Sequence, residues 1–392
     1  MRDVDVLIVG AGPAGATAAL NLAPLRRVAI VERSAEPSPR IGESLPAAAR
    51  RLFRDMGLLD SFLAQGHAPC YGNRSVWGDA QPRELDALRD PDGHGWHLDR
   101  VRFERWLRDA ATARGATVIA PATIERIERD GDAWLVTCCH PERESRDPAA
   151  GRHEAPASIR TPTQVPRLTL GMTTMTIRAS LIIDAAGRAA PIARRLGAQT
   201  RIDDRLVCGW VYGRDERHGS RGWTFVEATE DGWWYTAPMP HDRRVLAFHT
   251  DSDLPAARVA RDRDALLQSA RSTRKLASWL DDAGFVAEDA AGFTAAHSAT
   301  LEPCAGDGFL AAGDAALAFD PLSSQGLLNA LFTGLAAAEA ADSHLRGDAD
   351  AMSRYRDTIS GIAAAYRRHL SIYYGMEERW PDALFWKRRR NC

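Results

Sequence analysis

Lysine is nearly absent from this chain: Lys275 and Lys387 are the only two among 50 basic residues. Almost every basic group is therefore an arginine, whose guanidinium stays protonated and is not nucleophilic. The formal net charge of −2 also lacks the positive excess that nucleic-acid-binding proteins carry. The composition thus argues against a nucleic-acid partner, and it excludes chemistry that needs a lysine amine anywhere before Lys275.

Clustered cysteines and long apolar runs are also missing. The six cysteines are scattered and form no C-x-x-C pair, so we expect neither a metal site nor a disulfide framework. No apolar run approaches the roughly 20 residues needed to span a bilayer. A strand pattern begins within the first residues, which leaves no room for a signal peptide. We therefore expect a soluble, cytoplasmic protein without a membrane partner.

The N-terminus does contain a βαβ pattern. Residues 4–9 and 28–31 are continuous apolar runs, as in buried parallel strands, and residues 14–22 form an alanine-rich helical pattern between them. The turn before the helix carries the spacing G-x-G-x-x-G, and an acid closes the second strand. The predicted nucleotide site of this unit consists of Gly10, Gly12, Pro13, Ala14, Gly15, Glu32 and the adjacent Arg33.

The physical demands of a bound dinucleotide explain this pattern. Gly10 permits a tight turn, Gly12 lets the backbone approach a pyrophosphate, and Gly15 allows the helix to pack closely on the strand. The helix N-terminus offers free N–H groups and partial positive charge to the phosphates. Glu32 can accept hydrogen bonds from ribose hydroxyls, and it would repel a 2′-phosphate.

Two later turns complete the predicted site. Asp184 and Gly187 follow an apolar run, and Gly313-Asp314 follows another near the far end of the chain. A helix start at Gly326 would direct backbone N–H groups to the electron-rich edge of a flavin ring and so stabilise its reduced form. The other predicted cofactor contacts in this late segment are Pro321, Gln325 and Leu327.

With these three motifs, the chain resembles the flavin-dependent aromatic hydroxylase and halogenase superfamily, the p-hydroxybenzoate hydroxylase-like FAD fold, over nearly its whole length. The resemblance implies bound FAD, with Arg40 and Arg102 as further cofactor contacts. It also implies an α/β fold: a discontinuous Rossmann-type FAD-binding domain, an antiparallel β-sheet substrate domain and a helical C-terminal extension. We assign residues 1–75, 98–200 and 295–345 to the first, 76–97 and 201–294 to the second, and 346–392 to the third.

Residue patterns support this division. Period-2 alternation over residues 206–251 indicates an antiparallel sheet, with a turn at Asp231-Gly232. Apolar periodicity predicts helices over 46–65, 99–114, 265–280, 324–345 and 350–374. The polar stretch 140–166 reads as a surface loop. The aromatic tail that follows is either a partner-binding segment or a hydrophobic strap with a solvated basic end, and we favour the strap.

The segment Gly42-Glu43-Ser44 resembles the cofactor-side segment of the halogenase-like branch. Two departures disfavour halogenation: the Trp-x-Trp-x-Ile-Pro motif of tryptophan halogenases is altered at 232–238, and no lysine stands where theirs captures hypochlorous acid. The chain is most similar to the LodB-, GoxB- and QhpG-like flavoproteins of quinone-cofactor maturation. That resemblance implies hydroxylation of a tryptophan in a peptide or protein through a flavin C4a-hydroperoxide, with O2 and either NAD(P)H or a flavin reductase.

Candidate catalytic residues are Glu43, His97 and Trp234. Glu43 would relay protons or bond backbone amides, and His97 would face the flavin or serve as a structural histidine. Trp234 would help to wall an aromatic substrate or would belong to the core of the sheet. Other functions stay open: a free small aromatic substrate, halogenation through another residue, or a non-catalytic flavoprotein partner in a maturation complex.

Overall fold

The computed structural model describes residues 1–87, 90–141, 172–217 and 222–390. Its first sheet has β1 (Arg2–Val9) at the centre, paired in parallel with β2 (Val28–Val31) and β11 (Met172–Asp184). Among the described residues this sheet has eight strands, in the order β19-β20-β11-β1-β2-β8, with β10 on β11 and β9 on β10. The remaining strands are β8 (Thr117–Ile119), β9 (Thr123–Asp130), β10 (Ala133–Pro141), β19 (Ala305–Gly306) and β20 (Phe309–Ala311).

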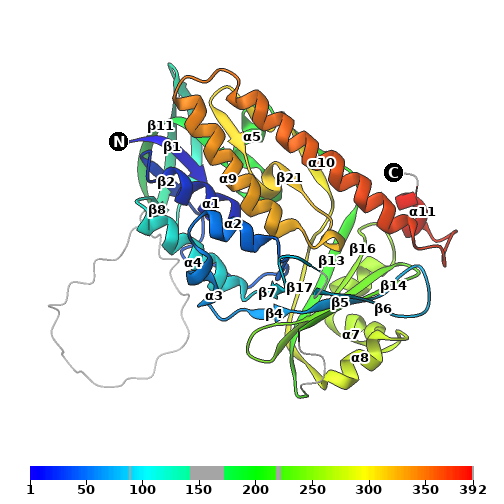
Figure 1. Cartoon of the computed structure of the whole chain (residues 1–392). Coiled ribbons are helices and arrows are strands. Elements are labelled where there is room, and N and C mark those ends of the chain that lie inside the picture. The colour runs from blue at the N-terminus through cyan, green and yellow to red at the C-terminus, as the bar shows by residue number, and fades with distance from the viewer. Residues whose placement is uncertain (88–89, 142–171, 218–221, 391–392) are drawn as a thin grey trace, which may run out of the picture.

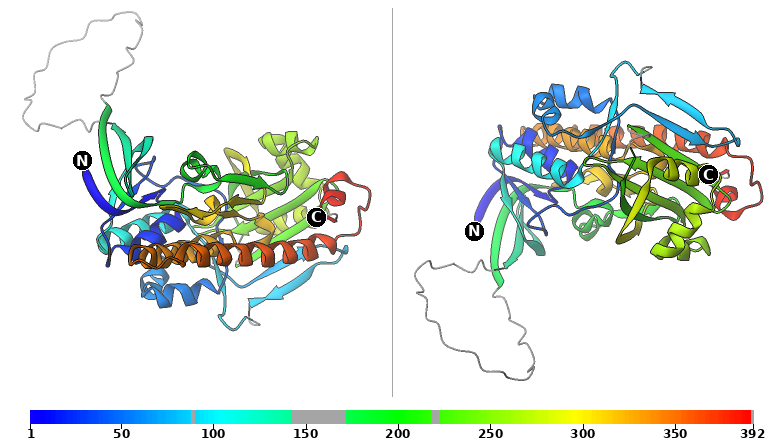
Figure 2. Two further views of the ribbon diagram at one scale, coloured as in Figure 1. Left: turned by 90° about the horizontal axis from the view of Figure 1, so that it is seen from above. Right: turned by 90° about the horizontal axis from the view of Figure 1, so that it is seen from below.

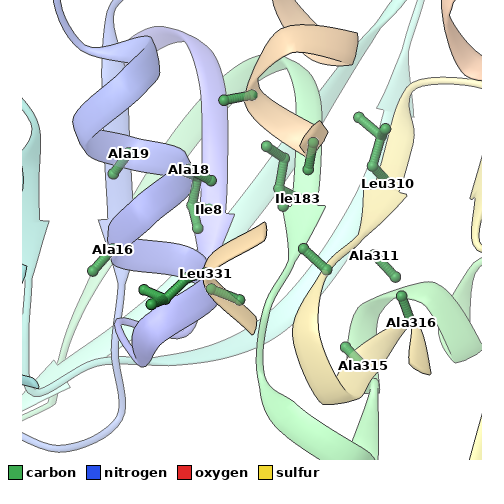
Figure 3. Packing of buried hydrophobic residues seen from close by; sticks show 14 of the residues in the cluster. Ile8, Ala16, Ala18, Ala19, Ile183, Leu310, Ala311, Ala315, Ala316 and Leu331 are labelled. Atoms are coloured by element: carbon green, nitrogen blue, oxygen red, sulfur yellow. The ribbon is translucent and has the colours of Figure 1, made fainter. Parts of the chain in front are cut away.

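Helices α1 (Pro13–Leu22), α4 (Arg100–Ala113) and α9 (Gly326–Leu345) pack together beside this sheet (Figure 1). Small side chains allow the close approach: a Cβ on Gly334 of α9 would lie 2.4 Å from the Ala14 carbonyl oxygen of α1. Figure 3 shows residues of the resulting core: Ala16, Ala18 and Ala19 from α1, Ile8 from β1, Ile183 from β11 and Leu310 from β20. The small side chains of α1 suit this close packing, because every residue of the helix except Asn21 is buried.

A second sheet forms the other half of the molecule (Figure 2). In the described ranges it has seven strands, in the order β17-β13-β16-β15-β14-β5-β6. All its pairings are antiparallel except the parallel pair of β14 and β5. The strands are β5 (Gly72–Val76), β6 (Arg83–Asp86), β13 (Leu206–Asp215), β14 (Trp223–Thr229), β15 (Gly232–Pro238), β16 (Arg243–Asp251) and β17 (Phe285–Ala295).

One face of this second sheet, the outer face, is covered by short helices. Phe225, Trp234 and Phe248 pack there against α6 (Ala256–Arg261), α7 (Arg263–Arg271) and α8 (Leu276–Ala283). Because side chains alternate along a strand, the residues between them point to the opposite face, the inner face. The inner face packs against Ile41 and Leu322, which belong to segments of the nucleotide half.

Short elements connect the two halves. They are β3 (Ser44–Leu45), α2 (Ala49–Asp55), α3 (Leu59–Leu63), β4 (Ala68–Cys70), β7 (Gly95–His97), η2 (Gly187–Ala189), α5 (Pro191–Arg195), β12 (Gln199–Ile202), β18 (Ala299–Glu302), η3 (Gly313–Ala315), β21 (Leu317–Ala318) and η4 (Pro321–Ser323). Strand β7 lies between β3 and β4, and β18 lies between β12 and β21.

Several expectations need correction. The helix expected over 46–65 is two helices, because α2 stops before Gly57, whose φ of 67° is left-handed. The helix expected over 265–280 likewise divides into α7 and α8. The domain boundary after residue 75 falls inside β5, which belongs to the second sheet. Most of the expected loop at 140–166 lies outside the described residues.

The C-terminal extension crosses from one half to the other. Helix α10 (Ala351–Gly375) packs against α9 and leads to α11 (Leu384–Arg390) at the end with the second sheet (Figures 1 and 2). Phe385 and Trp386 are fully buried there, which confirms the hydrophobic strap. Its basic end is not simply solvated as expected: Arg389 is buried and forms an ion pair with buried Asp251 at 2.7 Å. No described helix is both long enough and apolar enough to cross a bilayer.

Candidate functional site

The glycine turn after β1 has the geometry that the sequence predicts. Gly10 has a φ of 98°, which favours glycine, and a Cβ on Gly15 would lie 1.9 Å from the Gly10 carbonyl oxygen. Gly12 is different, because no atom lies within 4 Å of where its Cβ would be. Pro13 and Ala14 begin α1 directly after this open position. The N-terminus of α1 is thus left accessible to a phosphate group.

Glu32 lies at the end of β2 beside the turn. Its Oε2 accepts a hydrogen bond from the Ala11 amide at 2.7 Å, and its Oε1 accepts one from the Ser34 amide at 3.0 Å. Each carboxylate oxygen has a second lone pair, so the group retains capacity for ribose hydroxyls. Arg33, the next residue in the chain, is exposed.

A charged stripe on α4 faces this turn and was missed by the sequence reasoning. Arg108 donates from Nε to the Ala11 carbonyl oxygen at 3.0 Å, and buried Glu104 accepts from both Arg100 (2.6 Å) and Arg40 (2.8 Å). Arg40, a predicted cofactor contact, is thus held beside α4. The i, i+4, i+8 spacing of Arg100, Glu104 and Arg108 was the available signal, because it places three charges on one helix face.

Arg102 does not belong to this stripe. Its side chain is exposed and donates to the Gln65 carbonyl oxygen at 2.7 Å. The expectation that it contacts the cofactor is wrong for a geometric reason, since two residues along a helix turn a side chain by about 200°. Asp99 instead caps α4 by accepting from the Arg102 amide at 3.0 Å.

Asp184 also has a role different from the predicted one. Its carboxylate accepts hydrogen bonds from the Ala186, Ile192 and Ala193 amides at 2.8–3.1 Å, and it is fully buried. It therefore holds the turn after β11 and the start of α5 in place. Gly187 in that turn has a φ of 75° and open space around its Cβ position.

The late segment supplies the last part of the site. Gly313, with a φ of 62°, packs against Ala14 of α1, and half-exposed Asp314 lies 3.5 Å from the Arg188 guanidinium. Pro321, the first residue of η4, and Gln325, which follows it, are exposed, and Leu327 is buried in the first turn of α9. Gly326 begins α9, and no atom lies within 4 Å of its Cβ position.

These residues fit a dinucleotide with a flavin. Three glycines, Gly12, Gly187 and Gly326, have empty Cβ positions on three separate turns, and two of them lie at helix N-termini. Backbone N–H groups at α1 suit the pyrophosphate, and those at α9 suit the electron-rich edge of the ring. At each of these three glycines, a ligand could approach the backbone without displacing a side chain.

Glu43 connects the nucleotide half to the second sheet. Its buried carboxylate accepts from the Tyr235 hydroxyl at 2.5 Å and from the Gly42 amide at 3.0 Å. Burial raises the pKa of Glu43, while the Tyr235 and backbone hydrogen bonds oppose that shift. Ser44 follows in β3, opposite His97 of β7. Glu43 therefore contacts the inner face of the second sheet through its hydrogen bond with Tyr235.

The inner face carries aromatic residues in one row. Tyr235 lies across from Ala247, Ala247 from Trp210, and Trp210 from Gly292 on successive strands. The Trp210 indole lies over Gly292, where a Cβ would be 2.1 Å from the ring. Trp210 and Tyr235 are only partly buried, whereas Trp233 in the next row is fully buried. An aromatic surface thus remains beside Glu43.

Trp234 is not part of this surface. It stacks on Phe248 with ring centroids 4.6 Å apart, in the core beneath α7 and α8. The prediction that Trp234 is catalytic is wrong because strand alternation turns it to the outer face while its neighbours Trp233 and Tyr235 turn inward. The sequence shows two neighbouring tryptophans, but it does not show which face of the sheet each of them occupies.

His97 is also an unsuitable proton carrier. It is fully buried, and burial lowers its pKa to about 3, so it remains neutral near pH 7. Its Nε2 lies 2.8 Å from the Thr224 hydroxyl across the contact between β7 and β14. The structural alternative therefore describes His97 better than proton transfer does.

Asp320, just before η4, was not predicted but organises the late segment. It accepts from the Leu322 amide at 2.8 Å and from the Tyr374 hydroxyl at 2.7 Å. The Trp233 indole in turn donates to the Tyr374 oxygen at 3.1 Å. These hydrogen bonds connect helix α10 to the segment that precedes α9, so the C-terminal extension helps to hold that part of the site in place.

This carboxyl predicts a specific pH dependence. Burial, and then the charge of Asp204, raise the pKa of Asp320 from 3.8 to about 6, against the opposing charge of Arg389 and two hydrogen bonds. The folded state therefore holds the proton more tightly, and the stability gained at low pH is lost as pH rises from about 3, below the unfolded pKa, to about 7, above the folded pKa. Relative to Asp320→Asn, we expect the wild-type apoprotein to lose about 3 kcal/mol of unfolding free energy over that range.

Urea unfolding of both proteins at several pH values measures this difference. Groups that the two proteins share titrate alike in both, so their contributions cancel in the difference between the two unfolding free energies. A difference that is independent of pH would contradict the raised pKa of Asp320.

Comparisons with known proteins agree with this geometry. A family described as an FAD binding domain matches residues 3–146. The FAD-dependent oxidoreductase LodB of Marinomonas mediterranea is 28% identical over 404 residues, covering 99% of this chain and 97% of that protein. The structure of CmlS, a flavin-dependent halogenase, matches with a TM-score of 0.79 and 28% identity over 100% of this chain and 68% of its own.

A further solved structure shares the fold. QhpG, described as a peptidyl tryptophan dihydroxylase essential for tryptophylquinone cofactor biogenesis, has a TM-score of 0.69 and 23% identity. That match covers 99% of this chain and 79% of QhpG. Halogenases and hydroxylases therefore both occur among the proteins that this chain is similar to.

Proposed function

We propose that this chain, an FAD-dependent oxidoreductase of the flavin-dependent hydroxylase and halogenase superfamily, is a monooxygenase that hydroxylates an aromatic ring. The proposed ring is the indole of a tryptophan in a peptide or protein, and the similarity to QhpG supports that choice. Reduced FAD in such a site activates O2 so that one oxygen atom passes to an electron-rich ring. The electrons would come from NAD(P)H or from a separate flavin reductase.

The placement of the lysines is the observation that carries this choice of reaction. Lys275 is exposed at the start of α8, which covers the outer face of the second sheet, and Lys387 is exposed on α11. No lysine therefore reaches the inner face beside Glu43. An arginine cannot replace the amine that would capture an oxidised halogen, because its guanidinium is not nucleophilic.

The residues of the inner face supply what a hydroxylation needs from the protein. Trp210 and Tyr235 offer ring surfaces that orient a planar aromatic substrate. Ile41 and Leu322 pack against the same aromatic cluster and would limit access of water. Glu43 is a buried carboxylate that can take up the proton released when the ring regains aromaticity.

Incubation of the FAD-loaded protein with a tryptophan peptide, NADPH, a flavin reductase, O2 and chloride tests the proposal. We expect a product that gains one oxygen atom and no chlorine, as measured by mass spectrometry. A chlorinated product would favour the halogenase reading that the relatives suggest. An unmodified peptide, with free indoles and phenols equally unmodified, would favour a non-catalytic flavoprotein partner.

A further inference from the structure

The Tyr235 hydroxyl has only one proton, and that proton is already donated to Glu43. The phenol oxygen lies 2.5 Å from Glu43 Oε1, a separation typical of a charge-assisted O–H···O⁻ hydrogen bond. Burial, and then the charge of Glu43, keep the pKa of Tyr235 well above its ordinary value, so the phenol stays protonated. A phenol that donates its proton retains only acceptor capacity.

The other carboxylate oxygen is also an acceptor. Glu43 Oε2 accepts from the Gly42 amide at 3.0 Å, and backbone amides can only donate. The Arg100 guanidinium donates to the Gly42 carbonyl oxygen at 2.6 Å and brings positive charge close to the carboxylate. Both contacts lower the pKa of Glu43 and so oppose the effect of burial. With Glu43 ionised, the Tyr235 hydroxyl is the donor in the pair.

The acceptor oxygen lies at the edge of the aromatic row. Trp210 is in the same row, and its indole is held in place over Gly292. Ile41 precedes the Gly42-Glu43 segment and packs against the same clusters as Trp210 and Tyr235. A planar ring held against this surface would have its polar edge close to one fixed hydrogen-bond acceptor.

We propose that Tyr235 determines substrate specificity by accepting a hydrogen bond from a donor on the aromatic ring, such as the N–H of an indole. The inference rests on the proposed aromatic substrate and adds the group that the site recognises. A ring without that donor would leave the Tyr235 oxygen without a partner, and sites of this kind discriminate strongly against such analogues. Phenols share the donor chemistry and are the alternative class.

A change at Glu43 should weaken the preference. In Glu43→Gln the Gly42 amide still needs an acceptor, so the Gln carbonyl oxygen takes the place of Oε2 and the NH2 group faces Tyr235. That NH2 group donates to the phenol oxygen, and the Tyr235 proton is released toward the ring surface. Tyr235 would then act as a donor, with both side-chain volumes retained.

Equilibrium binding to the oxidised, FAD-loaded protein at about pH 8 tests this without turnover. The probes are indole against 1-methylindole and phenol against anisole, so that methylation caps each donor. We expect the uncapped ring to bind about tenfold more tightly or better, consistent with the cost of an unpaired buried polar group. In Tyr235→Phe the ratio should fall to about one, and in Glu43→Gln it should fall towards one.

Tyr212→Phe is the matched control, because Tyr212 is buried one row away with Arg243 over its ring. It should keep the wild-type ratio. If Tyr235→Phe fails to fold, Glu43→Gln decides the matter alone. Equal binding of capped and uncapped rings to the wild type would overturn this inference while an oxygenated product still stands. If no aromatic probe binds, the inference and the proposed substrate class both fail.

Discussion

Gly12→Val abolishes stable FAD binding while leaving the protein folded, and this is the largest functional effect that we expect. The Cβ position of Gly12 faces open space at the N-terminus of α1, where the pyrophosphate would lie. A branched side chain there would fill that space and keep the phosphates from the backbone N–H groups. We expect FAD affinity to fall by about a hundredfold or more, which corresponds to about 2.7 kcal/mol.

Titration of apoprotein with FAD, followed by absorbance or fluorescence, measures this loss. The backbone at Gly12 has a φ of −72°, which valine adopts readily, so the melting temperature of the apoprotein should change little. Gly361→Val is the matched control, since Gly361 of α10 also has empty space around its Cβ position but lies outside the site. If Gly12→Val remained yellow, the assignment of this turn to the pyrophosphate would be wrong.

Trp386→Ala should produce the largest loss of stability. Trp386 is fully buried, its ring lies 5.3 Å from that of Trp77, and its indole donates to the Thr229 carbonyl oxygen at 2.9 Å. Truncation removes the apolar surface and leaves a cavity, which together cost about 3–5 kcal/mol. That is a large share of the roughly 5–15 kcal/mol by which a typical domain is stable.

Leu384→Ala on the same helix is the control, because Leu384 is half exposed. Its unfolding free energy should stay within about 0.5 kcal/mol of the wild-type value, as is usual for surface changes. Thermal and urea unfolding of the two variants give the comparison. Similar melting of Trp386→Ala and wild type would mean that α11 is not part of the core, and the strap would lose its structural role.

The tail also shows where residue type alone was informative. Its closely spaced aromatic residues predicted a strap, and Phe385 and Trp386 are indeed buried. The run of basic residues that ends it suggested a solvated segment, yet Arg388 and Arg389 both bond to Asp251. Asp251 lies more than a hundred residues away in the sequence, and no local pattern indicates that a strand end will place it there.

Two of the wrong assignments share one cause, namely the direction of a side chain. Arg102 and Arg108 lie on the same helix, but only Arg108 turns toward the glycine turn. Trp234 and Tyr235 are neighbours on one strand, and only Tyr235 faces Glu43. Of the two roles considered for His97, facing the flavin or supporting the fold, the structure favours the second, because His97 of β7 is buried against Thr224 of β14.

By itself, the sequence determined the nucleotide site and the layout of the fold. Its signals are local: glycines at fixed spacing, alternation along strands and an alanine-rich helix each act within one or two elements. The tertiary structure alone decided which side chains meet at the aromatic surface. Glu43 and Tyr235 are 192 residues apart, and their contact depends on how the second sheet packs against the nucleotide half. Packing of this kind is set by burial summed over many residues, and no short stretch of sequence records it.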